Sequence, residues 1–257
     1  MKISALVLAK DEQEMIADCL RQLEFADEII VLDQNSQDRT VAIAKRYTDK
    51  IFKTTSWDFS KNRNYLKDLA QNMWLFYIDA DERIDQAQVE KIKEATDGPY
   101  SAYYFPRKNF ILGKWLKHGG WWPDYVPRLF KKDKLIGWMG PVHESPKIEG
   151  EFAYIDLPIK HLSARTVSQM FTKTIKWAKI EAELFYKANH RKVTVLRVLR
   201  SMLTEFVNRF FIKKGFFDGK IGLVQSVYQS LHWAIIFVYL WEIQNKTQVK
   251  LKKMINE

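Results

Sequence analysis

Residues 74–84 read WLFYIDADERI, and their composition decides how the front of the chain folds. The first five residues are apolar or aromatic, as in a strand that is buried on both faces. Three carboxylates, on Asp79, Asp81 and Glu82, follow with no glycine before them. Ligands of open α/β sheets bind outside the carboxyl ends of the strands, so acids at this position predict a binding site.

The sequence before this stretch alternates apolar runs of strand length with helical patterns. The runs ISALVLA (3–9) and EIIVLD (28–33) each lead into a helical pattern, and SKNRNYLKDLAQN (60–72) is a helix before the next strand. This alternation predicts an α/β fold whose sheet is mostly parallel and covered by helices on both faces. No G-x-G-x-x-G follows the first strand and no Walker lysine loop is found, which disfavours a dinucleotide fold and a P-loop enzyme.

Three of the predicted strands end in polar or acidic residues, and we expect these ends to converge on one crevice. The ends are Ala9-Lys10-Asp11-Glu12, Asp33-Gln34-Asn35-Ser36 and Asp79-Ala80-Asp81. Asp79 and Asp81 lie two residues apart, so in an extended chain their side chains share a direction. Such a carboxylate pair suits a hard divalent cation that bridges to a diphosphate. The alternative, that these acids only solvate a strand end, is left open by the spacing.

Charge differs between the front of the chain, residues 1–159, and the back, residues 160–257. From Lys160 onward there are 18 Lys and Arg against 6 Asp and Glu, whereas residues 1–159 carry 23 against 25. This asymmetry predicts chemistry in front and attachment to an anionic surface behind. The single Cys19 excludes an intrachain disulfide and indicates a reducing compartment. The short apolar run after Met1 is expected not to be a signal peptide.

The back of the chain has the pattern of amphipathic helices. VTVLRVLRSMLTEFVNRFFIKK (193–214) mixes apolar and basic residues, a composition suited to anionic membrane surfaces. Residues 221–241 have no formal charge and reach the length of a spanning helix. A polar stripe in their first half favours a helix packed on protein or lying in the interface, with a spanning helix as the alternative. The stripe consists of Gln225, Ser226, Gln229 and Ser230.

Taken in order, these pieces resemble the family-two glycosyltransferases of GT-A fold. IIVLDQNSQDRT stands where that family has V-D-x-x-S-x-D-x-T, NRN follows in a helix, and DADE comes next. RKNFILGKWLKHGGWWPDYVPRLF, GPVHE and KKGFFDGKIG are most similar to a bacterial branch that includes lipopolysaccharide core β-1,4-glucosyltransferases. The resemblance spans nearly the whole chain. It implies a Rossmann-like GT-A catalytic domain over residues 1–160 and a helical membrane-associating extension over 161–257.

The resemblance also implies which residues bind the nucleotide. Asp33 would accept a hydrogen bond from N3–H of a uracil-like base, and Arg63 would approach the base or the diphosphate. Gln34 stands where the family often has Asp, Ser or Gly, which leaves the nucleotide open. The nucleoside would be framed by Ala9, Lys10 and Glu12.

Metal and base roles follow from the same resemblance. Asp81 would hold Mn²⁺ or Mg²⁺ on the diphosphate, with Asp79 nearer the ribose or on the same metal. His161 is a candidate third ligand, and an ordinary structural histidine is the alternative. Glu144 in GPVHE is the candidate general base for the acceptor hydroxyl, and Asp124 is the second choice.

A segment rich in tryptophan and glycine lies between these motifs. Trp115, Trp121 and Trp122 are interleaved with glycines, which suits a loop that stacks on an acceptor sugar. The alternative is that they are core aromatics.

The expected function is an inverting hexosyltransferase that is cytoplasmic and peripheral on the cytosolic face of the inner membrane. Its donor would be a nucleotide sugar, expected to be a UDP-sugar. Its acceptor would be a lipopolysaccharide core or another lipid-linked glycan, and it would also bind an anionic membrane surface. A sugar nucleotidyltransferase of related fold is the alternative, although it needs a glycine-rich basic loop where AKDEQE stands. A nucleic-acid-binding module is suggested by a pI near 9.4. However, the basic charge follows amphipathic helices, so no nucleic acid is expected as a partner.

Overall fold

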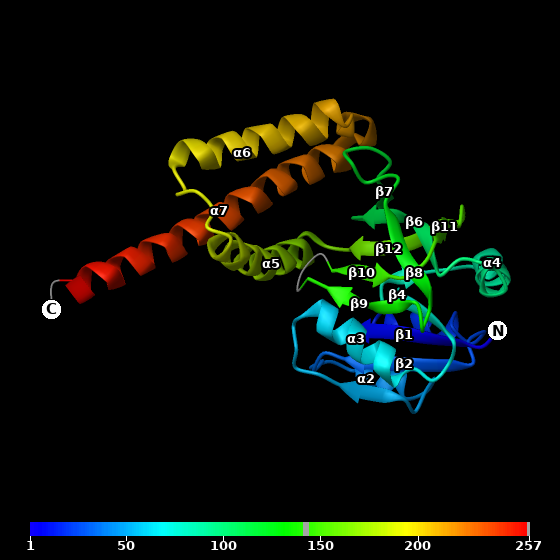
Figure 1. Ribbon diagram of the computed structural model, residues 1–257. Helices are drawn as coiled ribbons and strands as arrows, with labels where there is room; N and C mark the ends of the chain where they lie inside the picture. The colour runs from blue at the N-terminus through cyan, green and yellow to red at the C-terminus, as the bar shows by residue number, and fades with distance from the viewer. Residues whose placement is uncertain (141–143, 256–257) are drawn as a thin grey trace. The chain divides into compact units, whose positions relative to one another are not determined.

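The chain forms two compact units in the computed structural model (Figure 1). Unit 1 comprises Met1–Lys108 and Pro123–Leu162, and unit 2 comprises Asn109–Trp122 and Ser163–Glu257. The structure describes residues 1–140 and 144–255, with side chains up to residue 246. The chain enters unit 2 for the second time after Leu162, two residues beyond the boundary predicted from the sequence.

One sheet organises unit 1. Its first four strands are parallel, and β8 and β6 continue it in antiparallel pairing. The strand order is β3 (Ile51–Lys53), β2 (Glu28–Asp33), β1 (Ile3–Ala9), β4 (Trp74–Asp79), β8 (Tyr125–Lys131), β6 (Ala102–Ile111), β12 (Ile159–Ala164), β5 (Glu82–Arg83). Off this path, β6 also pairs with β7 (Lys114–Trp115) and β11 (Phe152–Tyr154), while β9 (Leu135–Met139) pairs with β10 (Ser145–Ile148).

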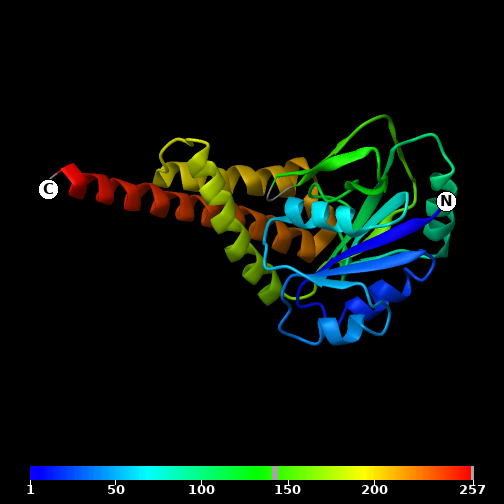
Figure 2. The same cartoon turned by 60° about the horizontal axis from the view of Figure 1, so that its bottom comes forward.

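Helices cover both faces of this sheet because its central strands are apolar on both sides (Figure 2). Successive side chains of a strand point to opposite faces. Val7 of β1 packs with α1 (Ile16–Arg21), α2 (Thr40–Ala44) and α4 (Gln86–Thr96). Its neighbour Leu6 packs on the other face with α3 (Phe59–Leu69). The predicted α/β class, with helices on both faces, is confirmed.

The carboxyl ends of the parallel strands lie side by side. Ala9 at the end of β1 is paired with Asp33 of β2, and Leu8 is paired with Asp79 of β4. Strands are spaced by about 4.8 Å, so the backbones at Asp33 and Asp79 lie about 10 Å apart across β1. The sheet therefore brings together the strand ends that the sequence marked with acids.

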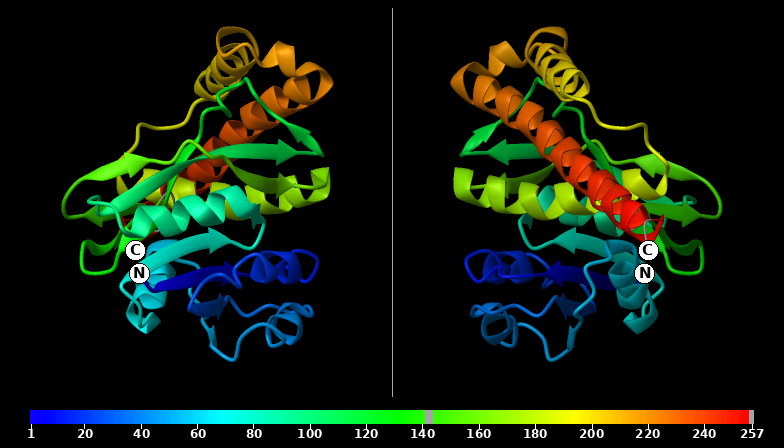
Figure 3. Two further views of the ribbon diagram at one scale, coloured as in Figure 1. Left: turned by 90° about the vertical axis from the view of Figure 1, so that its right-hand side faces the viewer. Right: turned by 90° about the vertical axis from the view of Figure 1, so that its left-hand side faces the viewer.

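Unit 2 is mainly helical. Its helices are α5 (Val167–Lys187), α6 (Val195–Val207), the π-helix η1 (Asn208–Ile212), the 3₁₀-helix η2 (Gly215–Asp218) and α7 (Gly219–Ile255). Figure 1 shows α6 alongside α7, and in both views of Figure 3 α6 lies next to the first, orange part of α7. Small side chains of α5, Ala178 and Ala182, are fully buried with Ile236, Phe237 and Leu240 of α7. The predicted C-terminal helical extension is present.

The long helix α7 carries the uncharged segment. Gly215–Lys246 is long and apolar enough to cross a membrane by length and composition, with 33% of its most apolar window buried inside the chain. Gln225, Ser226 and Ser230 of the predicted polar stripe are buried, at 3%, 2% and 6% exposure. The polar side of this helix therefore packs on protein.

Candidate active site

The loop after β1 is held by the loop after β2. Three consecutive backbone N–H groups of the first loop donate to side chains of the second. These are Asp11 to Ser36 Oγ at 2.9 Å, Glu12 to Thr40 Oγ1 at 2.8 Å and Gln13 to Asp38 Oδ2 at 3.0 Å. The side chains of the S-x-D-x-T motif thus fix the backbone of the loop after β1. Because these donors are already used, the loop does not offer them as a cradle for phosphate.

The residues predicted to frame a nucleoside meet at this edge of the sheet. Ala9 is buried and its carbonyl accepts from the Gln34 N–H at 2.8 Å, while Lys10 Nζ donates to the Gln34 carbonyl at 3.0 Å. The Asp33 carboxylate is 1% exposed and accepts from the Ser36 N–H at 3.1 Å. The structure brings these side chains together, and their nucleotide roles remain predictions.

Asp79 lies between two arginines. Its Oδ1 is 3.2 Å from Arg63 Nη2, and its Oδ2 accepts from Arg128 Nη2 at 2.6 Å. Burial would raise the pKa of Asp79, but the charges of Arg128 and then Arg63 outweigh burial and hold that pKa well below its usual range. Asp79 is therefore a permanent carboxylate at neutral pH.

Glu82 contacts both the Asp79 backbone and Arg128. It is fully buried and accepts from the Asp79 N–H at 3.1 Å and from Arg128 Nη2 at 2.5 Å. The pKa of Arg128 is lowered by burial but raised further by Asp79 and Glu82, so its guanidinium stays charged. The only sequence signal for Glu82 was its place in a run of acids. From the sequence, Arg107 and Arg128 could either bind phosphates or pair with nearby acids, and the structure shows the pairing.

The ion pairs continue to both candidate bases. Arg63 Nε donates to Glu144 Oε1 at 2.8 Å. At the other end, Arg107 Nε donates to Asp124 Oδ2 at 2.9 Å, and Arg107 Nη1 lies 3.5 Å from Glu82 Oε1. We call the connected set the carboxylate–arginine network. Its members in order are Glu144, Arg63, Asp79, Arg128, Glu82, Arg107 and Asp124.

Arg63 is positioned by its neighbours in the NRN motif and by aromatic rings. The Asn64 side chain donates to the Trp138 carbonyl at 3.0 Å and accepts from the Trp138 N–H at 2.8 Å, which fastens β9 to α3. The Arg63 guanidinium lies 4.9 Å from the Trp138 ring centre, within cation–π range. Tyr77 Oη donates to the Arg63 carbonyl at 3.0 Å. Asn64 and Trp138 were missed by sequence reasoning, because their pairing spans 74 residues.

The two aspartates of DADE face different partners. The chain turns at Ala80 and Asp81 instead of continuing extended, so the extended geometry from which a shared direction of Asp79 and Asp81 was expected is not present. Asp81 Oδ2 lies 3.4 Å from Nε2 of His161, which β12 places beside Glu82 of β5. The sequence placed this histidine near the acids only through the resemblance.

The described side chains offer few ligands for a divalent cation. Within residues 1–140 and 144–246, no three His, Cys, Asp or Glu side chains are grouped closely enough to hold a metal by themselves. Asp81 and His161 supply one oxygen and one nitrogen, a set that fits a cation whose shell is completed by substrate phosphates and water. Asp79 is less suited, because both of its oxygens already accept from arginines.

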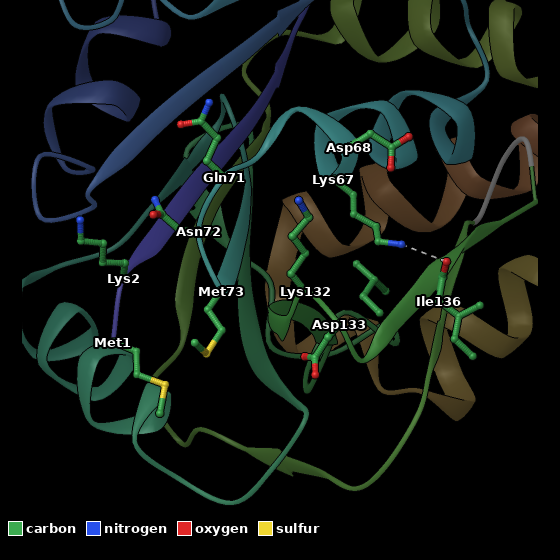
Figure 4. A pocket seen from close by; sticks show the side chains of 11 residues that line it. Met1, Lys2, Lys67, Asp68, Gln71, Asn72, Met73, Lys132, Asp133 and Ile136 are labelled. Atoms are coloured by element: carbon green, nitrogen blue, oxygen red, sulfur yellow. Dashed lines mark hydrogen bonds between the residues drawn. The ribbon is translucent and has the colours of Figure 1, made fainter.

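A separate hollow lies at the amino ends of the strands (Figure 4). Its volume is about 900 Å³, and Lys2 before β1 and Met73 before β4 line it. Lys67 Nζ donates to the Ile136 carbonyl at 3.1 Å across it. Because the acids of the network lie at the opposite ends of these strands, this hollow is not part of the candidate active site.

Comparisons with known proteins find a matching family model, related sequences and similar solved structures. Residues 4–145 match the family model for glycosyl transferase family 2. An uncharacterized glycosyltransferase of Rickettsia conorii is 24% identical over 246 residues, covering 88% of this chain and 85% of its own. The lipopolysaccharide core biosynthesis glycosyltransferase LpsC of Rhizobium meliloti is 27% identical over 197 residues, covering 71% of each chain. Among solved structures, TarS 1–349 of S. aureus with UDP-GlcNAc has a TM-score of 0.49 at 13% identity, covering 96% of this chain and 92% of its own.

Proposed function

The chain belongs to glycosyl transferase family 2, and on that premise we propose that it transfers a hexose from a UDP-sugar to a lipopolysaccharide core or another lipid-linked glycan, with inversion at the anomeric carbon. The observation that carries the proposal is the carboxylate–arginine network at the carboxyl ends of the parallel strands. It joins a donor-side carboxylate, Asp79, to a candidate base, Glu144, through one guanidinium. The similarity to LpsC supports the choice of acceptor.

Electrostatics supports a cation at the donor site. The network has four carboxylates and three guanidinium groups, and Asp81 adds a further negative charge. An incoming diphosphate would therefore meet a site of its own sign. A Mn²⁺ or Mg²⁺ ion held by Asp81 and His161 would supply the neutralising charge for the diphosphate leaving group.

The acceptor hydroxyl needs a base on the side opposite to the leaving group. In the proposed step, Glu144 removes the hydroxyl proton, the hydroxyl oxygen bonds to the anomeric carbon, and the bond from that carbon to the diphosphate oxygen breaks. Arg63 orients Glu144 and keeps its charge compensated. Asp124 is the second choice, because Arg107, Glu82 and Arg128 separate it from Asp79.

We place the enzyme in the cytoplasm on the inner face of the membrane, where nucleotide sugars are made. The buried thiol of Cys19 and the basic helices of unit 2 support this placement. A nucleotidyltransferase is disfavoured, because the N–H groups of Asp11, Glu12 and Gln13 are occupied by side chains.

A binding screen tests the proposal. UDP-, GDP- and ADP-sugars are titrated by calorimetry with and without Mn²⁺ or Mg²⁺ into wild type, Asp81→Ala and Asp133→Ala. Asp133 is exposed beside the hollow at the other ends of the strands, so it serves as the matched control. We expect metal-dependent binding of a UDP-sugar in wild type and Asp133→Ala, with loss in Asp81→Ala. If no nucleotide sugar binds, or if Asp81→Ala binds equally well, the assignment is wrong.

A further inference from the structure

Helix α6 exposes an apolar stripe along its whole length. No residue of α6, which the structure describes completely, is buried. We define the α6 face by six side chains at helical spacing that are 55–77% exposed. They are Val195, Leu196, Leu199, Leu203, Phe211 and Ile212, the last two from η1. A stripe of this length is costly in water, so it is expected to be covered.

The exposed apolar surface continues onto η2 and α7, where apolar side chains lie outside and polar side chains lie inside. Phe217 is 63% exposed, and Val227 of α7 is 43% exposed. By contrast, Ser226 and Ser230 point inward, where their hydroxyls donate to the carbonyls of Gly222 and Ser226 at 2.8 Å. Apolar side chains outside and satisfied polar side chains inside are the arrangement expected where the surroundings are lipid.

Charge indicates what covers this face. Unit 2 has 19 Lys and Arg against 6 Asp and Glu, whereas unit 1 has 22 against 25. The basic residues from the start of α6 to the start of α7 are Arg197, Arg200, Arg209, Lys213, Lys214 and Lys220. An apolar stripe with cationic flanks is complementary to an anionic bilayer surface, which offers acyl chains and phosphates together. A nucleic acid would leave the apolar stripe in water.

The tryptophan-containing segment Asn109–Trp122 is fastened to the tip of this same surface. The Asp218 carboxylate accepts from the backbone N–H of His118 at 2.8 Å and lies 3.2 Å from His118 Nδ1. Arg209 Nη1 donates to the Gly119 carbonyl at 2.9 Å, and its guanidinium lies 5.6 Å from the Trp121 ring centre. The segment and the helices therefore belong to one body.

We propose that the α6 face, with Phe216 and Phe217, inserts shallowly into an anionic bilayer, and that Asp218 and Arg209 thereby hold segment Asn109–Trp122 at the bilayer surface. Together with the proposed function, on which this step rests, the inference assigns the segment of the chain at which a lipid-linked acceptor would be met. The segment joins unit 1 within two residues of Arg107 and Asp124 of the network. Trp121 packs against Ile111, Leu116 and Met170, but the half-buried Trp115 and Trp122, held at the headgroups, would meet the sugars of a membrane-embedded glycolipid.

Vesicle binding tests the insertion. The full chain is sedimented with phosphatidylcholine vesicles that contain or lack phosphatidylglycerol, as wild type, as Leu199→Glu with Leu203→Glu, and as Met73→Glu. Met73 is an apolar residue of unit 1 that is 57% exposed, so it controls for charge at an exposed apolar site. We expect binding to anionic vesicles that falls about tenfold or more in the double variant and is unchanged in Met73→Glu. Equal binding by the double variant overturns the proposal. So does a dimer that the double variant abolishes without vesicle binding, which would assign the face to a second copy.

A fluorescent label tests the position of the segment. Cys19 is fully buried, so a polarity-sensitive dye on Lys117→Cys marks the segment selectively. We expect a blue shift with anionic vesicles, and its loss in Asp218→Ala and Arg209→Ala while vesicle binding persists. Arg200→Ala controls for the lost charge, and circular dichroism confirms that each variant is folded. An unchanged blue shift in both variants overturns the proposal that Asp218 and Arg209 hold the segment at the bilayer surface.

The two proposals fail separately. Calorimetry with UDP-sugars needs no vesicles, and vesicle sedimentation needs no sugar. Donor binding without vesicle binding refutes the docking surface alone, whereas vesicle binding without donor binding refutes the proposed function alone.

Discussion

Arg63 and Glu144 lie 81 residues apart in the sequence, yet Arg63 Nε donates to Glu144 Oε1 at 2.8 Å. The same guanidinium reaches Asp79 through Nη2 at 3.2 Å. One side chain therefore contacts both the candidate base and Asp79.

Replacing the Arg63 guanidinium tests whether its two contacts matter for catalysis. Arg63→Lys keeps the charge but cannot contact Asp79 and Glu144 in parallel. We expect kcat to fall by about ten- to a hundredfold through misplacement of the base, with a smaller change in donor KM. Steady-state kinetics of hexose transfer measures kcat and the donor KM separately. Arg46→Lys, at an exposed site, should behave as wild type, and an unchanged kcat in Arg63→Lys would show that the contact is dispensable.

Glu144 and Asp124 are distinguished by paired isosteric changes. Glu144→Gln should retain donor affinity and lose transfer by about 10²- to 10⁴-fold, as expected for removal of a general base. Asp124→Asn should reduce transfer much less, since Asp124 pairs with Arg107 at the far end of the network. Donor binding by calorimetry and transfer by product analysis separate the two effects. The reverse pattern would move the base to Asp124.

The buried charges of the network predict a stability effect. Arg128 is 3% exposed and compensates both Asp79 and Glu82. Arg128→Met leaves these two carboxylates with less positive charge, so the free energy of unfolding should fall by about 3–5 kcal/mol. Urea denaturation followed by circular dichroism measures the change, with Arg46→Met as the surface control. A loss no larger than that of the control would argue against a coupled network.

The lowered pKa of Asp79 predicts a pH dependence. The unfolded chain binds a proton to this carboxyl near pH 4, whereas the native chain does so only at lower pH. Ionised Asp79 therefore stabilises the fold above about pH 4, and this contribution is lost as the pH falls toward its native pKa. Between pH 7 and pH 3 the urea midpoint should drop more steeply for wild type than for Asp79→Asn. Parallel curves would contradict the assignment, and Asp133→Asn serves as the exposed control.

Close packing at the start of α7 predicts a further stability effect. A Cβ at Gly222 would collide with the backbone carbonyl of Gly215, where η2 lies against α7. Gly222→Ala must push these elements apart, and we expect unit 2 to lose about 1–3 kcal/mol of stability. Differential scanning calorimetry should show an earlier transition for this variant than for wild type or Lys220→Ala. An unchanged transition would mean that the helix shifts without cost.

Much of the fold was predictable from local composition. The runs at 3–9, 28–33 and 74–79 are apolar on both faces, and such strands must lie between two layers of helix. Their acidic ends consequently meet at one edge. The strands β8 and β6 were not anticipated, because their antiparallel pairing joins segments whose register no local period reveals.

The sequence by itself determined that buried parallel strands would deliver Asp33, Asp79 and neighbouring acids to one place, because burial and alternation are local properties of the chain. Tertiary structure alone decided which charges those acids would meet. Arg107 and Arg128 come from β6 and β8, and Glu144 precedes β10, so their distances to the acids depend on strand order and on the turn at Ala80 and Asp81. Ion pairing acts over a few ångströms in space irrespective of separation along the chain, and that is why only the folded structure specifies it.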